Sequence, residues 1–271
     1  MVGRPFLIVG NWKMNGTRAA LSELKAMEDG AVRNPQVDVV VCPPATLIER
    51  AASIAHGIEI GAQDCHGGES GAFTGRLSPA MLRDAGAKWV ILGHSECRAE
   101  GESDETVRAK ALRALAAGLA VIICVGEARD ARDRGEENAV VRSQLIASIP
   151  QVSGMTLVVA YEPIWAIGTG RTPTPGQIEE MHAYIRGVLI DRLGAPGEHL
   201  PILYGGSASA VNADALLSIS GVDGLLVGGA SLTAGSFAPI IDAAARRDLS
   251  PSITKARRSE APQQQATGVR I

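Results

Sequence analysis

Aromatic residues are scarce in this chain of 271 residues, where Trp, Tyr and Phe together make up 3%. Proteins that bind single-stranded nucleic acids stack bases on aromatic side chains, and nucleic-acid binders commonly carry a basic face. The chain lacks a basic excess as well, since its net charge is −3 and its isoelectric point is near 6.0. We therefore expect no nucleic-acid partner.

Long apolar runs are also missing, and none reaches the ~18 residues that a membrane-spanning helix requires. The segment 1–6 has one positive charge ahead of a short strand-like run, which is not the pattern of a secretory signal. These features predict a soluble, cytoplasmic protein without a membrane partner.

The four cysteines are widely spaced and contain no C-x-x-C pair. A disulfide framework is therefore not expected. Cys65-His66 is the only Cys/His adjacency, and neighbouring residues rarely share one tetrahedral metal site. We expect neither a metal nor another cofactor, and we interpret Cys42 and Cys124 as small core residues because both lie in apolar runs.

Eight short apolar runs recur along the chain, and most are unbroken rather than alternating. Unbroken runs are typical of parallel strands that are covered on both faces. The runs are Phe6–Gly10, Val37–Cys42, Ile58–Ala62, Trp89–Leu92, Ala120–Val125, Thr156–Tyr161, Pro201–Tyr204 and Gly224–Val227.

Alanine-rich amphipathic stretches with helix signals separate these runs. Ser78-Pro79 and Thr174-Pro175 each combine an N-cap residue with proline at the first helical position, and a third helix is predicted from Ser103 to Ala117. Eight βα units within residues 1–245 favour a closed (β/α)8 barrel as a single domain. No G-x-G-x-x-G follows the first strand, as a dinucleotide fold would require. The polar segment 246–271 is predicted to be a flexible tail.

The segment 157–170 is the most informative part of the chain. Apolar residues at 157–160 predict a buried strand that leads to the carboxylate of Glu162. Pro163 follows at once, and an apolar loop then runs to position 170. A carboxylate at a strand end, beneath a loop that excludes water, is suited to removing a proton from carbon. The alternative is a buried glutamate in an ion pair beside an ordinary loop.

The other strand ends carry reactive groups too, and in a (β/α)8 barrel the chemistry lies at these ends. Asn11 and Lys13 follow the first strand, and His94 and Glu96 follow the fourth. Glycine-rich turns at 205–207 and 228–231 follow the last two strands, where such barrels bind phosphate. Each feature has an alternative: Lys13 as a solvated loop cation, His94 as a core imidazole and the glycines as simple turns.

Five segments resemble those of triosephosphate isomerases in order and approximate spacing. They are 11–15 (NWKMN), 93–96 (GHSE), 161–170 (YEPIWAIGTG), 204–207 (YGGS) and 227–232 (VGGASL). The resemblance covers about residues 5–245, and the 161–170 segment is highly specific to the family. It implies an isomerase that interconverts glyceraldehyde-3-phosphate and dihydroxyacetone phosphate through an enediolate, without a cofactor.

By this resemblance, Glu162 is the base that moves a proton between neighbouring carbons, and a neutral His94 hydrogen-bonds the enediolate oxygens. A helix beginning near Ser95 would disfavour the imidazolium form of His94. Lys13 supplies positive charge, while Asn11 and Glu96 organise its surroundings.

The resemblance further implies which residues contact the phosphate and which form a lid over the site. The phosphate ligands are Gly168, Ser207, Gly228 and Gly229, and the lid comprises Pro163, Ile164, Trp165, Ala166, Ile167, Gly168, Thr169 and Gly170. Closure of such a lid uses binding energy from the remote phosphate.

The segment 65–75 resembles the long third loop of the family, which inserts into a partner subunit near its Lys13. The resemblance therefore implies a homodimer, with Phe73, Thr74 and Gly75 in the inserted loop and Thr74 near the partner subunit's Asn11 and Glu96. The alternative is a plain surface excursion.

Two other functions are compatible with parts of the pattern. An isomerase of larger phosphosugars would have a wider pocket and a shorter lid, and a non-catalytic phosphate-binding relative would have lost Lys13, His94 or Glu162. The chain departs from the family at Cys97, where a second arginine is usual, in the short segment 99–101, and at Pro173. We expect weaker ion pairing near Glu96 and a restricted lid hinge.

Overall fold

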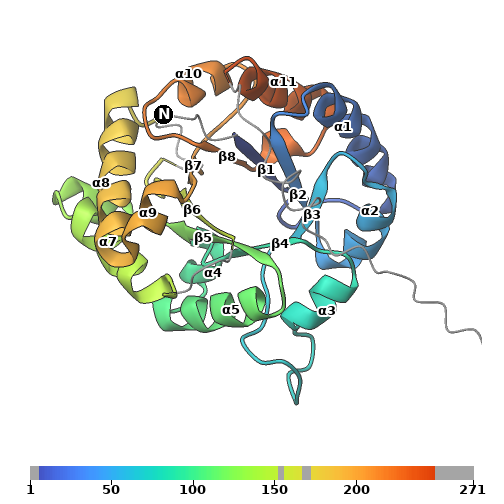
Figure 1. The fold of residues 1–271 in the computed structure, drawn as a ribbon, viewed down its shortest axis with the longest axis horizontal. Coiled ribbons are helices and arrows are strands. Elements are labelled where there is room, and N and C mark those ends of the chain that lie inside the picture. Colours follow the sequence, from blue (N-terminus) through green and yellow to red (C-terminus); the bar gives the residue numbers. More distant parts are fainter. Residues whose placement is uncertain (1–5, 152–155, 167–171, 248–271) are drawn as a thin grey trace, which may run out of the picture.

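The computed structural model describes residues 6–151, 156–166 and 172–247, which form a closed parallel barrel ringed by helices (Figure 1). The strands are β1 (Leu7–Asn11), β2 (Asp38–Cys42), β3 (Glu59–Ala62), β4 (Trp89–Leu92), β5 (Ala120–Val125), β6 (Leu157–Tyr161), β7 (Ile202–Tyr204) and β8 (Gly224–Val227).

The α-helices are α1 (Leu21–Arg33), α2 (Ile48–Ile54), α3 (Pro79–Asp84), α4 (Ser95–Ala99), α5 (Asp104–Ala116), α6 (Arg129–Asp133), α7 (Glu137–Ser148), α8 (Pro175–Leu193), α9 (Ala195–His199), α10 (Ala213–Leu217) and α11 (Ala234–Ala245). Three 3-10 turns accompany them: η1 (Arg18–Ala20), η2 (Ala45–Leu47) and η3 (Gly229–Ser231).

The strands follow one another around the barrel in chain order, and β1 closes it by pairing with β8. All eight pairings are parallel, so all eight carboxyl ends lie at the same end of the barrel. The predicted fold class is therefore confirmed. Seven predicted runs contain a whole strand, and the first overlaps β1, which extends one residue further to Asn11.

Strand residues alternate between two buried clusters. The inner cluster fills the barrel with Leu7, Val9, Val40, Cys42, Trp89, Ile91, Ala120, Ile122, Cys124, Val158, Ala160, Leu203 and Leu226. The outer cluster joins the other strand residues to the helices. Cys42 and Cys124 are core residues, as predicted, and all four cysteines are free thiols.

Helix starts match the predicted caps. The Ser78 hydroxyl accepts a hydrogen bond from the Met81 N–H ahead of α3, and the Ser103 hydroxyl accepts one from the Thr106 N–H ahead of α5. Thr174 forms a capping box with Gln177 at the start of α8. These local bonds satisfy N–H groups that would otherwise lack partners at a helix end.

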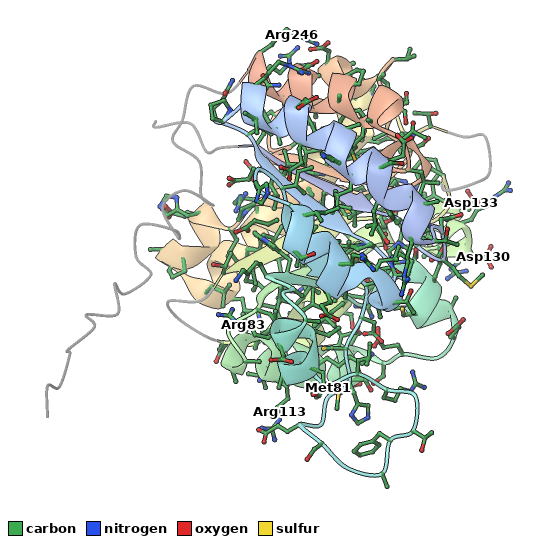
Figure 2. The ribbon with its side chains drawn as sticks, turned by 90° about the vertical axis from the view of Figure 1, so that its right-hand side faces the viewer. Met81, Arg83, Arg113, Asp130, Asp133 and Arg246 are labelled. Carbon is green, nitrogen blue, oxygen red and sulfur yellow. The ribbon has the colours of Figure 1, made fainter. Side chains whose placement is uncertain are left out.

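The loop between β3 and α3 extends away from the barrel, beyond α3 and Arg113 (Figure 2). Its ring pair, His66 and Phe73, has centroids 4.0 Å apart, and Phe73 is still 47% exposed. Arg113 on α5 forms an ion pair with Glu69 of the loop at 2.8 Å. The prediction of a long loop without regular structure is confirmed.

In the part of the chain that the structure describes, no helix combines the length and apolar character needed to cross a membrane. Arg246, where the predicted tail begins, caps α11 and forms an ion pair with Asp214 at 2.6 Å. The remainder of that predicted tail, residues 248–271, lies outside the described residues.

Gly126 provides a test of the packing between the ends of β5 and β6. A Cβ atom at this position would lie 1.8 Å from the carbonyl oxygen of Glu162, a backbone atom that cannot move aside freely. We expect Gly126→Ala to lower the free energy of unfolding by about 3 kcal/mol or more. Gly187 is the matched control, because it is exposed in α8 with no atom near its Cβ position.

Gly187→Ala should raise the free energy of unfolding by about 0.5–1 kcal/mol through helix propensity. Urea unfolding of both variants, followed by circular dichroism, measures the two effects. Equal stability of Gly126→Ala and the wild-type protein would contradict the packing described here.

Candidate active site

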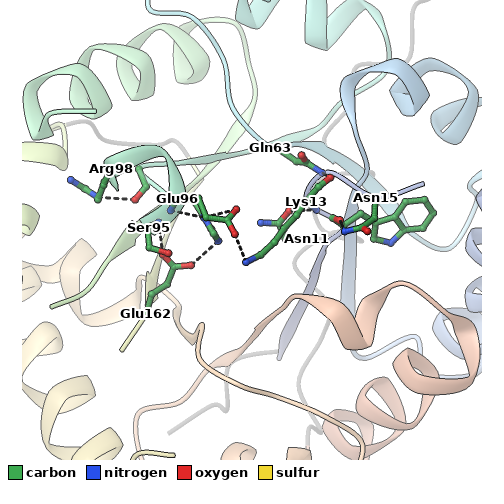
Figure 3. Close-up of polar contacts among 11 residues, drawn as sticks. Asn11, Lys13, Asn15, Gln63, Ser95, Glu96, Arg98 and Glu162 are labelled. Carbon is green, nitrogen blue, oxygen red and sulfur yellow. Dashed lines mark hydrogen bonds and ion pairs between the residues drawn. The ribbon is translucent and has the colours of Figure 1, made fainter. Parts of the chain in front are cut away.

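A cavity of about 430 Å³ opens at the carboxyl end of the barrel. Its lining includes Asn11 and Lys13 after β1, His94 after β4, Glu162 after β6, and the glycine turns after β7 and β8. The closed sheet thus brings these sequence-predicted residues together, as Figure 3 shows for the polar ones. Glu96 does not line the cavity but contacts Lys13 from its edge.

The carboxylate of Glu162 is buried, with 2% of the residue exposed. Its Oε2 atom accepts a hydrogen bond from the Ser95 N–H at 2.9 Å, and its Oε1 atom lies 3.0 Å from His94 Nε2. A buried carboxylate without such donors would be strongly unfavourable. Neither of these two contacts comes from a lysine or an arginine.

The imidazole of His94 has a defined orientation. Its Nδ1 atom accepts a hydrogen bond from the Glu96 N–H at 3.2 Å, which places the proton of the neutral ring on Nε2. Nε2 then donates toward Glu162 Oε1. A neutral ring that donates from Nε2 can hydrogen-bond a substrate oxygen in the same cavity.

Lys13 lies in the left-handed region with φ of 52°, the only non-glycine residue with positive φ in the described ranges. This conformation is held from two sides. The Lys13 N–H donates to Asn11 Oδ1 at 2.9 Å, and Gln63 Nε2 donates to the Lys13 carbonyl at 2.8 Å. Gln63 also donates to the Cys42 carbonyl at 2.9 Å, which ties the Lys13 turn to β2.

The ammonium of Lys13 forms an ion pair with Glu96 at 2.8 Å. Partial burial works against the charged form of Glu96, but the hydrogen bond and charge of Lys13 outweigh it and lower the pKa of Glu96. Within the described residues, no group of three or more His, Cys, Asp and Glu side chains is arranged to hold a metal ion.

Comparison with known proteins connects this geometry to a family. The family model described as Triosephosphate isomerase matches residues 6–244. The chain belongs to the triosephosphate isomerase family. The predicted family and enzyme class are thereby confirmed.

Individual relatives and a solved structure are similar to this chain over most of its length. The chain is 54% identical over 241 residues to the triosephosphate isomerase of Ruegeria sp. (strain TM1040), covering 88% of this chain and 98% of that protein. It is 53% identical to the triosephosphate isomerase of Afipia carboxidovorans over 242 residues, 88% of this chain and 96% of that protein. The crystal structure of the Bartonella henselae enzyme superposes with a TM-score of 0.82 at 41% identity, covering 88% and 98% of the two chains.

The glycine turns line the same cavity as Glu162 and His94, and the turn after β7 lies beside Glu162. Gly205, Gly206 and Ser207 line it after β7, and Gly228 and Gly229 line it after β8, where η3 begins. Side chains would not fit at the first turn, since a Cβ on Gly206 would lie 2.2 Å from the Tyr204 hydroxyl. Exposed backbone at such turns is suited to binding a phosphate.

Only the first part of the predicted lid is described. Pro163 to Ala166 form a turn closed by a hydrogen bond from the Ala166 N–H to the Pro163 carbonyl at 2.8 Å. The remaining predicted lid residues, Ile167, Gly168, Thr169 and Gly170, lie outside the described residues, as does the predicted phosphate ligand Gly168.

A buried carboxylate that the sequence analysis did not identify fixes the start of the lid. Glu127 Oε1 accepts hydrogen bonds from Trp165 Nε1 at 2.7 Å and from the Tyr161 hydroxyl at 3.0 Å. The Arg132 guanidinium lies 3.4 Å from the same carboxylate and 5.4 Å from the centre of the Trp165 ring. Glu127 directly follows Gly126 at the end of β5, so the strand-end rule that identified Glu162 would have found it too.

Two of the three departures from the family pattern, Cys97 and Pro173, can be placed in the structure. Glu96 keeps a direct cationic partner in Lys13, although Cys97 occupies the position of the usual arginine. Arg98 is largely buried and turns away from the cavity toward Asp104. Pro173 is buried directly before Thr174, the N-cap of α8, so the closing end of the predicted lid joins a capped helix.

Burial of Glu127 gives a prediction for the pH dependence of stability. Burial raises the pKa of Glu127 from its ordinary value of 4.5, against the hydrogen bonds that favour the carboxylate. The folded state therefore holds this proton more tightly than the unfolded state, and stability is lost as pH rises from 4.5 through the raised pKa. Glu127→Gln removes this titration while keeping an oxygen acceptor for Trp165.

We expect the free energy of unfolding of the wild-type protein, relative to Glu127→Gln, to fall as pH rises above 4.5. Urea unfolding across pH 4–8 measures the difference, and near-ultraviolet circular dichroism checks that Trp165 keeps its packing. A difference that is constant or grows with pH would refute the account.

Proposed function

We propose that this pocket interconverts glyceraldehyde-3-phosphate and dihydroxyacetone phosphate, with Glu162 as the base. Family membership supports the reaction, and the contact between Glu162 Oε1 and His94 Nε2 at 3.0 Å supports the assignment of roles. The base and the hydrogen-bond donor for the enediolate thus lie within one substrate's width of each other.

The proton transfer involves two changes of partner. Glu162 leaves the Ser95 N–H and His94 Nε2, turns toward the substrate and removes a proton from one carbon. The freed Nε2–H of His94 then donates to the oxygens of the enediolate. Glu162 returns the proton to the neighbouring carbon, while the hydroxyl proton of the substrate moves to the former carbonyl oxygen through His94 Nε2, which gives a proton to one oxygen and takes one from the other. The atoms and electrons of substrate and product balance, so the reaction needs no oxidant, reductant or cofactor.

Positive charge at the cavity mouth comes from Lys13, which attracts the substrate phosphate and stabilises the negative oxygen. Its strained backbone, braced by Asn11 and Gln63, directs the ammonium along the cavity edge, where Glu96 holds it. Asn11 and Glu96 are thus assigned to positioning Lys13.

The phosphate is assigned to the glycine turns after β7 and β8. Ser207, Gly228 and Gly229 line the cavity there, and Gly168 joins them by family resemblance. The lid 163–170 closes over the bound triose, with Trp165 as the contact that holds its first turn to Glu127. A cavity of about 430 Å³ is at the small end of ligand pockets, which favours a triose over a larger phosphosugar.

The proposal includes a homodimer formed through the 65–75 loop. Phe73 in this loop is 47% exposed, and Leu77 and Met81, which follow the loop in sequence, are 38% and 54% exposed; Met14, after β1, is 97% exposed. Exposed large apolar side chains of this kind are available for a subunit contact. The loop of one subunit then supports Lys13 and Glu96 of the other.

We assign the protein to the cytoplasm and to central sugar metabolism. All four cysteines are free thiols, which suits a reducing compartment. Triose phosphates are the substrate class that the family implies.

Glu162→Gln is expected to lower kcat by about 10²–10⁴-fold or more, because it removes the base and keeps the shape. Binding of inorganic phosphate should stay nearly unchanged, since the glycine turns lie on other strands. Glu162→Asp keeps a carboxylate but withdraws it by one methylene, so its kcat should lie between those of the wild-type protein and Glu162→Gln. A coupled assay of glyceraldehyde-3-phosphate conversion measures these effects. If Glu162→Gln retained more than a tenth of wild-type turnover, the assignment of Glu162 as the base would be refuted.

Phe73→Asp is expected to convert the dimer to monomers with little activity. Burying a phenylalanine stabilises by about 1.5–3 kcal/mol, and a twofold interface contains the contact twice. Val32→Asp is the control, because Val32 is 64% exposed and its helix, α1, lies away from the loop (Figure 1). Analytical ultracentrifugation measures the state of each protein. A wild-type protein that is monomeric at micromolar concentration and fully active would exclude the dimer.

A further inference from the structure

Arg98 is a largely buried arginine on α4, and the reaction described above does not use it. The side chain is 12% exposed, and its guanidinium contacts four groups. Nε donates to the Gly93 carbonyl at 2.7 Å, Nη1 to Asp104 Oδ1 at 2.5 Å, and Nη2 to the Cys124 carbonyl at 3.1 Å and the Ser148 hydroxyl at 3.2 Å.

Two of these acceptors are backbone carbonyls at the carboxyl ends of β4 and β5, next to the candidate active site. Gly93 directly precedes His94, and its carbonyl receives the Nε bond. Cys124 lies in β5 opposite Ala160 of β6, and the next carbonyl, that of Val125, accepts the Glu162 N–H at 2.8 Å. The guanidinium of Arg98 therefore connects the end of β4, which leads to His94, with the end of β5, which is hydrogen-bonded to the backbone of Glu162.

The helix that carries Arg98 also holds both reacting side chains. The Ser95 N–H donates to Glu162, and the Glu96 N–H donates to His94, as Figure 3 shows around the labelled residues. A helix of five residues has little stability of its own, so its position depends on tertiary contacts. Arg98 supplies two long-range contacts, to the Cys124 carbonyl and the Ser148 hydroxyl, beside shorter-range ones to Gly93 and Asp104.

The other two acceptors form a fixed support outside the barrel. Asp104 is the first residue of α5, and the fully buried Ser148 at the end of α7 donates to Asp104 Oδ1 at 3.0 Å. A planar guanidinium can reach acceptors on several sides at once, whereas a lysine ammonium has neither its span nor its fixed geometry.

We propose that Arg98 is a positioning residue for the isomerisation. It fixes α4 and the ends of β4 and β5, and thereby sets the relative position of His94 and Glu162. Arg98 does not line the cavity and contacts no glycine turn after β7 or β8. The inference rests on the proposed roles of His94 and Glu162.

Arg186 offers a matched control at the opposite end of the barrel. It is 19% exposed and donates to the Gly197 and Leu200 carbonyls and to Asp223. Leu200 precedes β7 and Asp223 precedes β8, so these contacts lie at the amino ends of the strands. That end of such barrels serves stability, whereas the carboxyl end serves catalysis.

The test compares Arg98→Lys with Arg186→Lys. A planar enediolate analogue is used to titrate the functional active sites of each variant, and kcat is expressed per titrated site. Arg98→Lys should lower kcat about 10- to 100-fold, because small displacements of reacting groups have effects of this size. The inhibition constant of inorganic phosphate should stay within about twofold, since the phosphate turns are untouched. Arg186→Lys should lower the unfolding temperature and leave kcat per site unchanged.

An unchanged kcat in Arg98→Lys, or an equal loss in Arg186→Lys, would overturn the proposal. So would a parallel weakening of phosphate inhibition, because that indicates general disorder of the site. If Arg98→Lys does not fold, Asp104→Asn serves instead: it keeps an acceptor and weakens the anchor, and kcat should fall about 3- to 10-fold with phosphate inhibition unchanged. A folded Asp104→Asn with wild-type kcat would likewise overturn the proposal.

The wild-type protein is assayed first with glyceraldehyde-3-phosphate. An inactive wild-type protein would refute the proposed function itself, whereas an active one beside an unimpaired Arg98→Lys would refute only the role of Arg98. Guanidinium ion at low concentration, added to Arg98→Ala, should raise kcat in a saturable way, and a flat response would count against positioning by this group.

Discussion

Pairing of β1 with β8 is the constraint on which the rest of this protein depends. Closure brings eight parallel carboxyl ends to one rim, so groups far apart in the chain come into contact there. Glu162 meets the Ser95 N–H across 67 positions of sequence, and Lys13 meets Glu96 across 83. The cavity exists because the inner cluster fills the barrel below this rim and leaves the top open.

Buried carboxylates at the rim are held in two different ways. Glu162 accepts a hydrogen bond from the Ser95 N–H and lies 3.0 Å from His94 Nε2, with no lysine or arginine in contact among the described residues. Glu127 accepts bonds from Trp165 and Tyr161 and lies beside Arg132, an arrangement suited to holding the first turn of the lid. Under the proposed mechanism the first carboxylate must change partners while the second stays as an anchor, and the contact with Arg132 distinguishes the second from the first.

Two arginines brace the two ends of the barrel. Arg98 donates hydrogen bonds to carbonyls at the ends of β4 and β5, next to His94 and Glu162. Arg186 donates to a carbonyl ahead of β7. In the proposed function, the substrate phosphate, the reacting carbon and the subunit contact are placed on separate parts of one rim: the turns after β7 and β8, the ends of β4 and β6, and the loop after β3. A change in one part can alter binding, turnover or assembly separately.

The sequence by itself determined the eight strands, the caps at Ser78, Ser103 and Thr174, and the residues at the strand ends, including His94 and Glu162. These features depend on residues close together in the sequence, which form apolar runs and N-caps. The segments that resemble the family identified the reaction. Only the tertiary structure decided that Gln63 braces the left-handed Lys13, that Glu127 binds Trp165, and that Arg98 joins Gly93 to Cys124. Most of these contacts join segments that follow different strands, so their geometry is set only when the barrel closes.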